Sequence, residues 1–199
     1  MTPDPVAGLL LAAGEGRRYG APKALVDLAG RPLVDRAAGV LHDAGCDPVV
    51  VVLGAAADQV RAVAALPGCL VVDNPRWRAG MGSSLRAGLA ALAGTAARSV
   101  VVLLVDMPGV TPEAVRRVAV HAGPSALAVA SYAGRRGHPV LLGRDHWPAI
   151  AAQAAGDAGA RAYLRAHGAE TRLVPCEDVA DDHDVDTPDD WLRWACRKR

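Results

Sequence analysis

The sequence predicts an α/β protein: a three-layer sandwich in which helices cover both faces of a mostly parallel central sheet. Short β-branched runs alternate with alanine-rich stretches along the 199 residues. The first four runs are continuous rather than alternating in hydrophobicity, as expected of parallel strands covered on both faces. These runs lie at Val6–Leu11, Val49–Leu53, Leu70–Val72 and Val100–Val105.

Helical patterns separate these strands in the first half of the chain. They cover residues 33–44, 56–66 and 84–92. Each strand–helix–strand step of this kind requires a right-handed crossover to a parallel neighbour. The first half is therefore predicted to be a wound parallel sheet.

The second half is less regular. Thr111 and Pro112 open a helix as N-cap and first-turn proline. Strands are predicted near residues 126–130, 139–142 and 171–174, helices near 145–154 and 160–166, and a last helix from Thr187-Pro188. The length suits one domain, and no repeat or long linker interrupts it, so residues 1–199 are predicted to form a single domain.

Composition excludes several classes of partner. The formal net charge is +1 and 51% of the residues are hydrophobic, which argues against binding nucleic acid through phosphate neutralisation. No apolar run approaches the roughly 20 residues that span a bilayer. The start M-T-P-D-P lacks the basic and apolar regions of a signal peptide. We expect a cytoplasmic protein with neither a nucleic-acid nor a membrane partner.

A glycine-rich loop follows the first strand. Its glycines are spaced G-x-G-x-x-x-G (Gly14, Gly16, Gly20), one residue longer than the dinucleotide fingerprint, and no acid ends the second strand. A P-loop needs G-K-S/T, but here Lys23 precedes an alanine. A plain strand-to-helix turn explains the glycines but not Arg18 and Lys23. The remaining interpretation is a loop whose amides and cations wrap a polyphosphate.

Lys23 also stands out by residue type. It is one of two lysines among 22 basic residues, the rest being arginines. A compact ammonium differs from the planar arginine fork, so a point charge is expected in this loop.

The loop L-A-A-G-E-G-R-R-Y-G-A-P-K resembles the signature L-A-A-G-x-S-x-R-M-G-x-x-K of the nucleotidyltransferases that activate molybdenum cofactor. Gly16 replaces the usual serine and Tyr19 the usual methionine. The G-x-G variant also occurs in related sugar-nucleotide and cytidylyl transferases. The loop alone therefore identifies the superfamily and not the substrate.

Four later segments match the same family in order, so the resemblance covers essentially the whole chain. The first runs from Asn74 to Leu89 and is similar to N-x-x-W-x-x-G-x-x-S-S-L-x-x-G-L. It predicts a glycine-flexed loop and a serine-capped helix, with Ser84 contacting base or ribose; simple capping by Ser83 is the alternative. The second is Asp106-Met107-Pro108, whose aspartate ends a buried strand. In the family this aspartate holds Mg²⁺ against the nucleotide phosphates.

The third segment pairs Gly137-His138-Pro139 with the G-D-x-G-A-R element that ends at Arg161. In the cytidylyl branch these elements border the acceptor pocket. Arg161 is suited to bind an acceptor phosphate through two parallel hydrogen bonds, whereas no acid–base role is assigned to His138.

The fourth segment, Asp184-Val185-Asp186-Thr187-Pro188, is similar to the family's D-I-D-T-P. Alternation along an extended chain points Asp184 and Asp186 to the same side, where either is a candidate Mg²⁺ ligand beside Asp106, with Asp186 the first choice. Alternatively, several of these acids serve only to start the last helix.

The resemblance implies a nucleotidyltransferase topology (glycosyltransferase-A-like, Rossmann-like) and a Mg²⁺-dependent enzyme that transfers CMP from CTP to the phosphate of molybdopterin cofactor. It also implies a molybdoenzyme or its chaperone as a partner. The predicted catalytic residues are Arg18, Lys23 and Asp106, and the acceptor residues are His138 and Arg161. The predicted nucleotide-binding residues are Leu11, Ala12, Ala13, Gly14, Glu15, Gly16, Gly20, Lys23, Gly80, Ser83 and Ser84, and the metal ligands are Asp106, Asp184 and Asp186.

Base choice rests on Ala13, since the guanylyl branch tends to show L-A-G-G and uridylyl relatives share L-A-A-G. Other interpretations stay open: a guanylyl or sugar-phosphate transferase, a nicotine-blue-type oxidoreductase that uses NAD(P)H, and a non-catalytic chaperone that carries cofactor.

Overall fold

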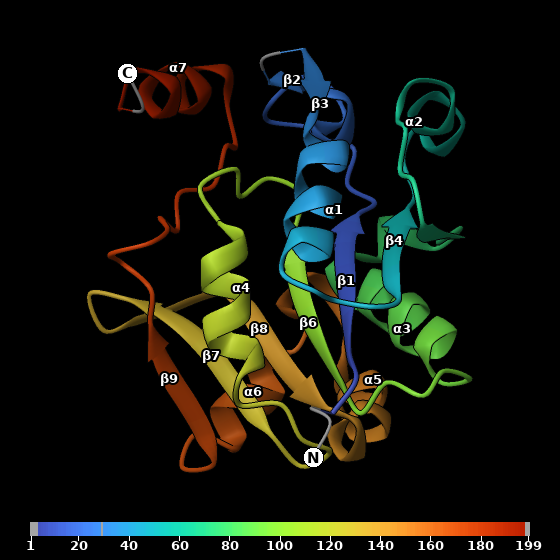
Figure 1. Cartoon of the computed structure of the whole chain (residues 1–199). Helices are drawn as coiled ribbons and strands as arrows, with labels where there is room; N and C mark the ends of the chain where they lie inside the picture. The colour runs from blue at the N-terminus through green and yellow to red at the C-terminus, as the bar shows by residue number, and fades with distance from the viewer. Residues whose placement is uncertain (1–3, 29, 198–199) are drawn as a thin grey trace.

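The structure is a computed structural model, and it describes residues 4–28 and 30–197, with side chains as far as residue 194. Its centre is a seven-stranded sheet in the order β5-β4-β1-β6-β8-β7-β9 (Figure 1). The strands are β1 (Val6–Ala12), β4 (Val49–Leu53), β5 (Cys69–Asp73), β6 (Ser99–Leu104), β7 (Leu127–Tyr132), β8 (Arg135–Gly143) and β9 (Thr171–Pro175). A small hairpin, β2 (Asp27–Leu28) with β3 (Arg31–Pro32), stands apart.

The sheet is mostly parallel, as the sequence predicts. β1 pairs in parallel with β4 on one side and with β6 on the other, so that Leu9 lies opposite both Val50 and Val102. β8 runs antiparallel to its neighbours β6 and β7. β8 forms a hairpin with β7, which is why this strand is longer than residues 139–142.

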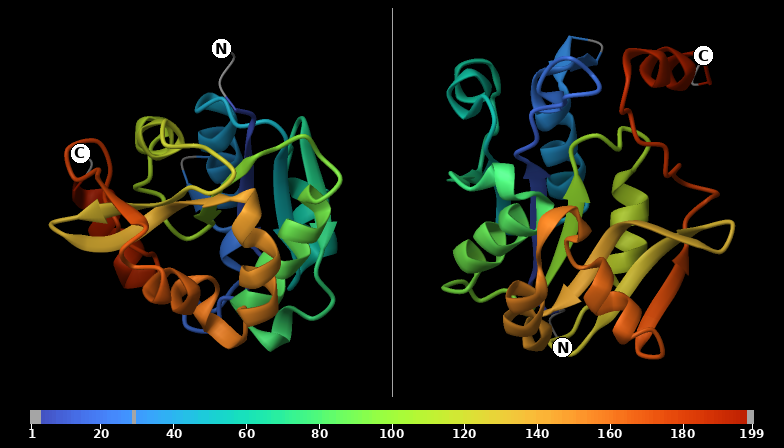
Figure 2. Two further views of the ribbon diagram at one scale, coloured as in Figure 1. Left: turned by 90° about the horizontal axis from the view of Figure 1, so that it is seen from below. Right: turned by 180° about the vertical axis from the view of Figure 1, so that it is seen from behind.

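Helices cover both faces of the sheet (Figures 1 and 2). One face packs on α1 (Leu33–Asp43), α2 (Ala57–Val63) and α4 (Pro112–Ala119). The other packs on α3 (Met81–Leu92), α5 (Trp147–Gln153) and α6 (Arg161–Ala166). α7 (Pro188–Arg197) follows β9 after a long irregular segment. The three-layer prediction is confirmed.

Two predicted elements differ for identifiable reasons. The helix expected over 56–66 ends at Val63, because Ala64 is extended and the Asp35 carboxylate accepts the amides of Ala65 and Leu66. β5 is not covered on both faces as its continuous apolar run predicts. It is an edge strand, and Leu70 is 47% exposed.

Two predicted helix starts are also corrected. α3 begins at Met81 with Gly80 at its N-cap and no capping side chain, so the expectation of a serine-capped helix is wrong. The helix expected over 145–154 is a 3₁₀ turn (Arg144–His146) followed by α5. By contrast, Thr111 caps α4 as predicted, accepting the Ala114 amide at 3.3 Å.

The carboxyl ends of β1, β4 and β6 lie at one edge of the sheet, where open α/β folds bind ligands. Short 3₁₀ turns continue the chain there, at Lys23–Leu25 after β1 and at Trp77–Ala79 after β5. Within the described residues, no helix has the length and apolar character needed to span a membrane.

Candidate functional site

Three segments that are far apart in the sequence meet at this edge. Lys23 follows the glycine loop, Asp106 follows β6, and Asp186 precedes α7. The Lys23 ammonium donates to Asp106 Oδ2 at 2.7 Å and to Asp186 Oδ1 at 2.5 Å. Arg18 adds a second cation, with its guanidinium 2.8 Å from Asp186 Oδ2.

The sheet register explains how these segments meet. β1 and β6 are neighbours, with Leu11 paired to Leu104, so the loops that follow them emerge side by side. Asp186 is brought in by the neighbouring Val185, which is fully buried and whose amide donates to the Asp106 carbonyl at 2.9 Å.

The two carboxylates determine the charge state of Lys23. Burial, which leaves its side chain 14% exposed, disfavours the ammonium, but Asp106 and Asp186 outweigh that penalty and raise its pKa. Lys23 therefore stays protonated at neutral pH. The group combines two cations with two carboxylates at the mouth of a cavity.

The glycine loop adopts a conformation that requires glycine at two positions. Gly16 has φ +64°, and a Cβ there would lie 1.9 Å from the Ala21 carbonyl oxygen. Gly20 has φ +86°, and its amide donates to the Gly16 carbonyl at 2.8 Å. Gly14 is exposed and has open space around it, so the main chain there is accessible to a ligand.

A cavity of about 480 Å³ lies between this loop and the carboxylates. Most of the predicted nucleotide and metal residues line it. Four do not: Ala12 belongs to the core, Gly20 and Asp184 lie outside the lining, and Ser83 is turned inward. The predicted residues along its wall are Leu11, Ala13, Gly14, Glu15, Gly16, Arg18, Lys23, Gly80, Ser84, Asp106 and Asp186.

The two serines of α3 are organised by a residue to which the sequence analysis gave no role. The buried Asn74 amide donates to Ser83 Oγ at 2.8 Å and to Ser84 Oγ at 3.0 Å. The Ser83 hydroxyl also lies within hydrogen-bond reach of the Gly80 carbonyl. Ser84 reaches the cavity wall and Ser83 supports the loop before α3.

Trp77 is a second residue without a predicted role. It lines the cavity, and the Arg78 guanidinium lies 4.3 Å from its ring centre. A Cβ at Gly54 would lie 2.6 Å from the Trp77 Cβ and 2.8 Å from the Ala13 Cβ. The absence of a side chain at Gly54 therefore allows Ala13 and Trp77 to lie close to each other at the cavity. The sequence signal for both residues is the N-x-x-W element, in which Asn74 is the asparagine and Trp77 the tryptophan.

A second, more apolar cavity of about 150 Å³ adjoins the first and shares Leu11, Met81, Leu104 and Asp157 with it. Both predicted acceptor residues, His138 and Arg161, line it. Its other walls are mainly aliphatic: Leu85, Val102, Val129, Val140, Leu142 and Leu164.

The charge of His138 is suppressed in this cavity. Burial lowers its pKa to about 4, with Asp106 opposing the shift and Arg161 adding to it. The imidazole is therefore neutral at pH 7.

The donor chemistry of the carboxylates suits a metal ion. Asp106 and Asp186 each place one oxygen on the same cation, the Lys23 ammonium. Asp184 is exposed as a whole residue, but the surrounding protein partly desolvates its carboxyl group. This desolvation, followed by the negative charges of Asp106 and Asp186, raises its pKa, so Asp184 lies within electrostatic range of the same group. No cluster of three metal-ligating side chains occurs in the part of the chain that the structure describes. Two hard carboxylates that leave positions for phosphate oxygens fit Mg²⁺.

The chain is similar in sequence and fold to known proteins. Residues 8–171 match the family described as the MobA-like NTP transferase domain. The chain belongs to this family.

Among curated members of similar sequence is "Nicotine blue oxidoreductase" of Paenarthrobacter nicotinovorans, 41% identical over 94% of this chain and 95% of that protein. "Molybdenum cofactor guanylyltransferase" of Rhodobacter capsulatus is 34% identical over 72% of this chain and 66% of its own length.

Solved structures share the fold of the family. The homologue of Mycobacterium tuberculosis Rv0371c from Mycobacterium sp. strain JC1 is 32% identical, covers 96% of both chains and superposes with a TM-score of 0.84. Rv0371c of M. tuberculosis H37Rv, crystallised as a complex with manganese, is 32% identical over 95% of this chain and 97% of that one, with a TM-score of 0.76.

Proposed function

We propose that the protein transfers CMP from CTP to the phosphate of a molybdopterin-type cofactor and releases pyrophosphate. The observation that carries the proposal is the meeting of Lys23, Asp106 and Asp186 beside the glycine loop. This arrangement offers amides and cations to a triphosphate, and carboxylates to its metal ion. Membership of the family supports nucleotidyl transfer.

In this reaction the acceptor phosphate attacks the α-phosphorus in line, and the bond to the leaving pyrophosphate breaks. No covalent enzyme intermediate is needed, so the protein acts by positioning and charge neutralisation. Arg18, Lys23 and the amides of residues 14–20 bind the triphosphate. Asp106 and Asp186 would hold Mg²⁺, which would neutralise phosphate charge when bound. A relative's complex with manganese supports a divalent-ion site.

The second cavity supports an acceptor with a planar ring system. Its aliphatic side chains can pack on the face of a ring, and Arg136 and Asp157 on the same wall offer polar partners to its edge. Arg161 lies on that wall and offers a fork for the acceptor phosphate. The residues that the two cavities share support an acceptor bound next to the nucleotide.

CTP is proposed on the basis of Ala13. Ala13 lines the cavity next to Gly54 and Trp77, and its methyl leaves less room there than a glycine would, which favours a pyrimidine over a larger purine. Relatives named guanylyltransferases make GTP the main competitor. Calorimetry with Mg²⁺ and each of CTP, GTP, UTP and ATP tests the choice. Tighter binding of GTP than of CTP would contradict it.

A second candidate function is oxidation or reduction of an aromatic pigment with NAD(P)H. The observation that favours it is the 41% identity to the protein named nicotine blue oxidoreductase. The glycine spacing and the missing acid after β4 oppose a dinucleotide site. Titration with NADPH, followed by its fluorescence, separates the candidates. Saturable NADPH binding with no response to CTP and Mg²⁺ would favour this second function.

A further inference from the structure

An irregular segment carries Asp186 to the site. β9 ends at Pro175 and α7 begins at Pro188, and residues 176–187 between them run past α4 and the turn that follows β6 (Figure 1). From the contacts of this segment we infer that Gly109, Arg117 and Asp178 are positioning residues that hold Asp186 against Asp106. The importance given to Asp186 rests on the proposed function, whereas the contacts themselves do not.

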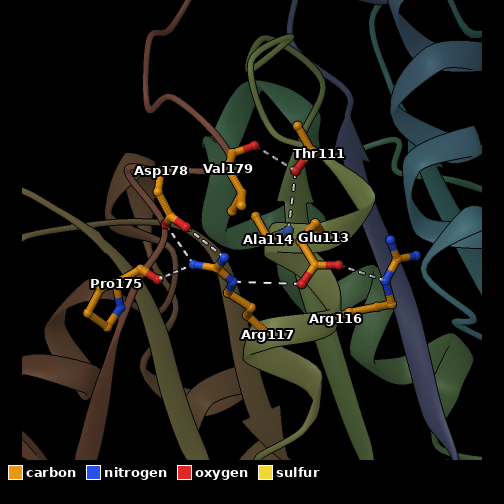
Figure 3. A network of polar contacts seen from close by, with 8 residues as sticks. All are labelled: Thr111, Glu113, Ala114, Arg116, Arg117, Pro175, Asp178 and Val179. Carbon is orange, nitrogen blue, oxygen red and sulfur yellow. Dashed lines mark hydrogen bonds and ion pairs between the residues drawn. The ribbon is translucent and has the colours of Figure 1, made fainter.

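The first point of attachment is a bidentate ion pair on α4 (Figure 3). Arg117 donates from its two terminal nitrogens to Asp178, at 2.6 Å and 2.8 Å. The first of these nitrogens also donates to the Pro175 carbonyl at 3.3 Å. Glu113 lies 3.7 Å from Arg117 Nε and steadies the guanidinium from the other side. The fork therefore fixes both ends of the stretch 175–178.

The second point of attachment is the start of α4 (Figure 3). The Thr111 hydroxyl donates to the Val179 carbonyl at 3.0 Å while accepting the Ala114 amide at 3.3 Å. One hydroxyl group therefore both caps α4 and attaches the segment to it. A shift of the first turn of α4 is expected to move residue 179 with it.

The third point is the turn between Asp106 and Gly109. The Asp181 amide donates to the Gly109 carbonyl at 3.2 Å, and the Val185 amide donates to the Asp106 carbonyl at 2.9 Å. A Cβ on Gly109 would lie 2.3 Å from Asp181 Oδ1 and 2.9 Å from its backbone oxygen. Because the φ of Gly109 is not in the left-handed region, glycine is required there for space rather than for backbone conformation.

These contacts connect the two proposed metal ligands, Asp106 and Asp186, through a short series of bonded and packed residues. Residues 106 to 117 are one continuous run, from Asp106 through the turn and into α4. That run holds residues 175 to 185, and Asp186 follows directly. The spacing of the two carboxylates therefore depends on contacts that lie outside the cavity.

The primary test is native-state amide exchange of Val185 followed by NMR. Gly109→Ala should raise its exchange rate roughly tenfold or more, because a methyl without space displaces the segment. Arg117→Gln should raise it about threefold, since an exposed ion pair contributes little by itself. The controls are Gly94→Ala, where a Cβ meets nothing within 4 Å, and Arg116→Gln, whose side chain pairs with Glu113 and the Asp43 carbonyl instead of the segment. Neither control should change Val185 exchange.

The second test connects this geometry to the site. The dissociation constant of Mn²⁺ is measured by electron paramagnetic resonance at saturating CTP. This dissociation constant should rise in both variants, and it should rise more in Gly109→Ala than in Arg117→Gln, as Val185 exchange does. Arg117→Lys, which keeps a cation between Asp178 and Glu113, should bind Mn²⁺ more tightly than Arg117→Gln, a recovery that a general loss of stability would not give.

Unchanged Val185 exchange in both variants would overturn the inference, as would faster exchange with unchanged Mn²⁺ affinity. If the wild-type protein bound neither CTP nor Mn²⁺, the proposed function would fail. Val185 exchange would then decide by itself whether these residues hold the segment in place.

Discussion

Lys23 and Asp106 are 83 residues apart in the chain, yet the ammonium of one lies 2.7 Å from a carboxylate oxygen of the other. This contact connects the glycine loop after β1 with the turn after β6. The first prediction concerns its removal. Lys23→Ala and Asp106→Ala should each lower the rate of pyrophosphate release from CTP and cofactor by about 10²–10³, the usual loss for one electrostatic contact to the transition state.

Circular dichroism should show that both variants keep the fold. The control is Arg98→Ala, which removes a cation paired with Asp4 at the opposite end of the sheet. Full activity in either Lys23→Ala or Asp106→Ala would remove that residue from the mechanism.

The second prediction separates the two candidate aspartates. Asp186 contacts Lys23 and Arg18 directly, whereas Asp184 is exposed and acts on the group through space. Asp186→Asn should weaken Mn²⁺ binding in the presence of CTP by at least about tenfold, a difference of ~1.4 kcal/mol. Asp184→Asn should change it by less than about threefold. The reverse order, measured by the same titration, would make Asp184 the ligand.

The third prediction concerns base selectivity. Ala13→Gly removes the methyl that lies next to Gly54 and Trp77 in the cavity. One methyl in an apolar wall changes discrimination by about 1–3 kcal/mol. The ratio of CTP to GTP affinity, measured by calorimetry with Mg²⁺, should therefore fall by about tenfold. An unchanged ratio would show that Ala13 does not face the base.

The fourth prediction concerns the acceptor. Arg161 lines the apolar cavity, and Arg165, one turn later on α6, does not. Arg161→Ala should raise the KM for the phosphorylated acceptor about tenfold while leaving the KM for the nucleotide unchanged, because it removes a charge-assisted contact to one substrate. Arg165→Ala is the matched control. Equal effects of both variants would indicate a general change in surface charge.

The fifth prediction is a pH dependence of stability. The pKa of His138 is about 4 in the folded protein, below its ordinary value of ~6.5. Between these values the unfolded chain binds a proton that the native protein does not, so the free energy of unfolding falls as the pH falls from 6.5 to 4. This loss amounts to as much as ~3 kcal/mol over the window.

Replacing the imidazole removes this contribution. Urea unfolding of His138→Gln at pH 7, 6 and 5 should show a shallower decline than the wild-type protein. His167→Gln, which removes an imidazole outside the cavity, is the comparison. A decline as steep as that of the wild type would assign the acid sensitivity to other groups.

Much of the fold was predictable because it depends on local pattern. The continuous apolar runs at β1, β4 and β6 predicted buried parallel strands, and Thr111 with Pro112 predicted the start of α4. In two of the places where prediction failed, a side chain elsewhere in the chain took the group that the prediction had used. The Asp35 carboxylate takes the amides that would have continued α2, and Asn74 holds the serine that was expected to cap α3.

The sequence by itself determined the alternation of strands and helices and the chemical identity of the loop, the D-M-P turn and the late acidic segment, because spacing and residue type are properties of the chain. Only the tertiary structure decided that Lys23 bonds both Asp106 and Asp186, and that Gly109 and α4 hold the segment that brings Asp186 there. Those relationships depend on which strands become neighbours and on contacts between residues that are 58 or more positions apart in the chain. No local pattern in the sequence encodes them.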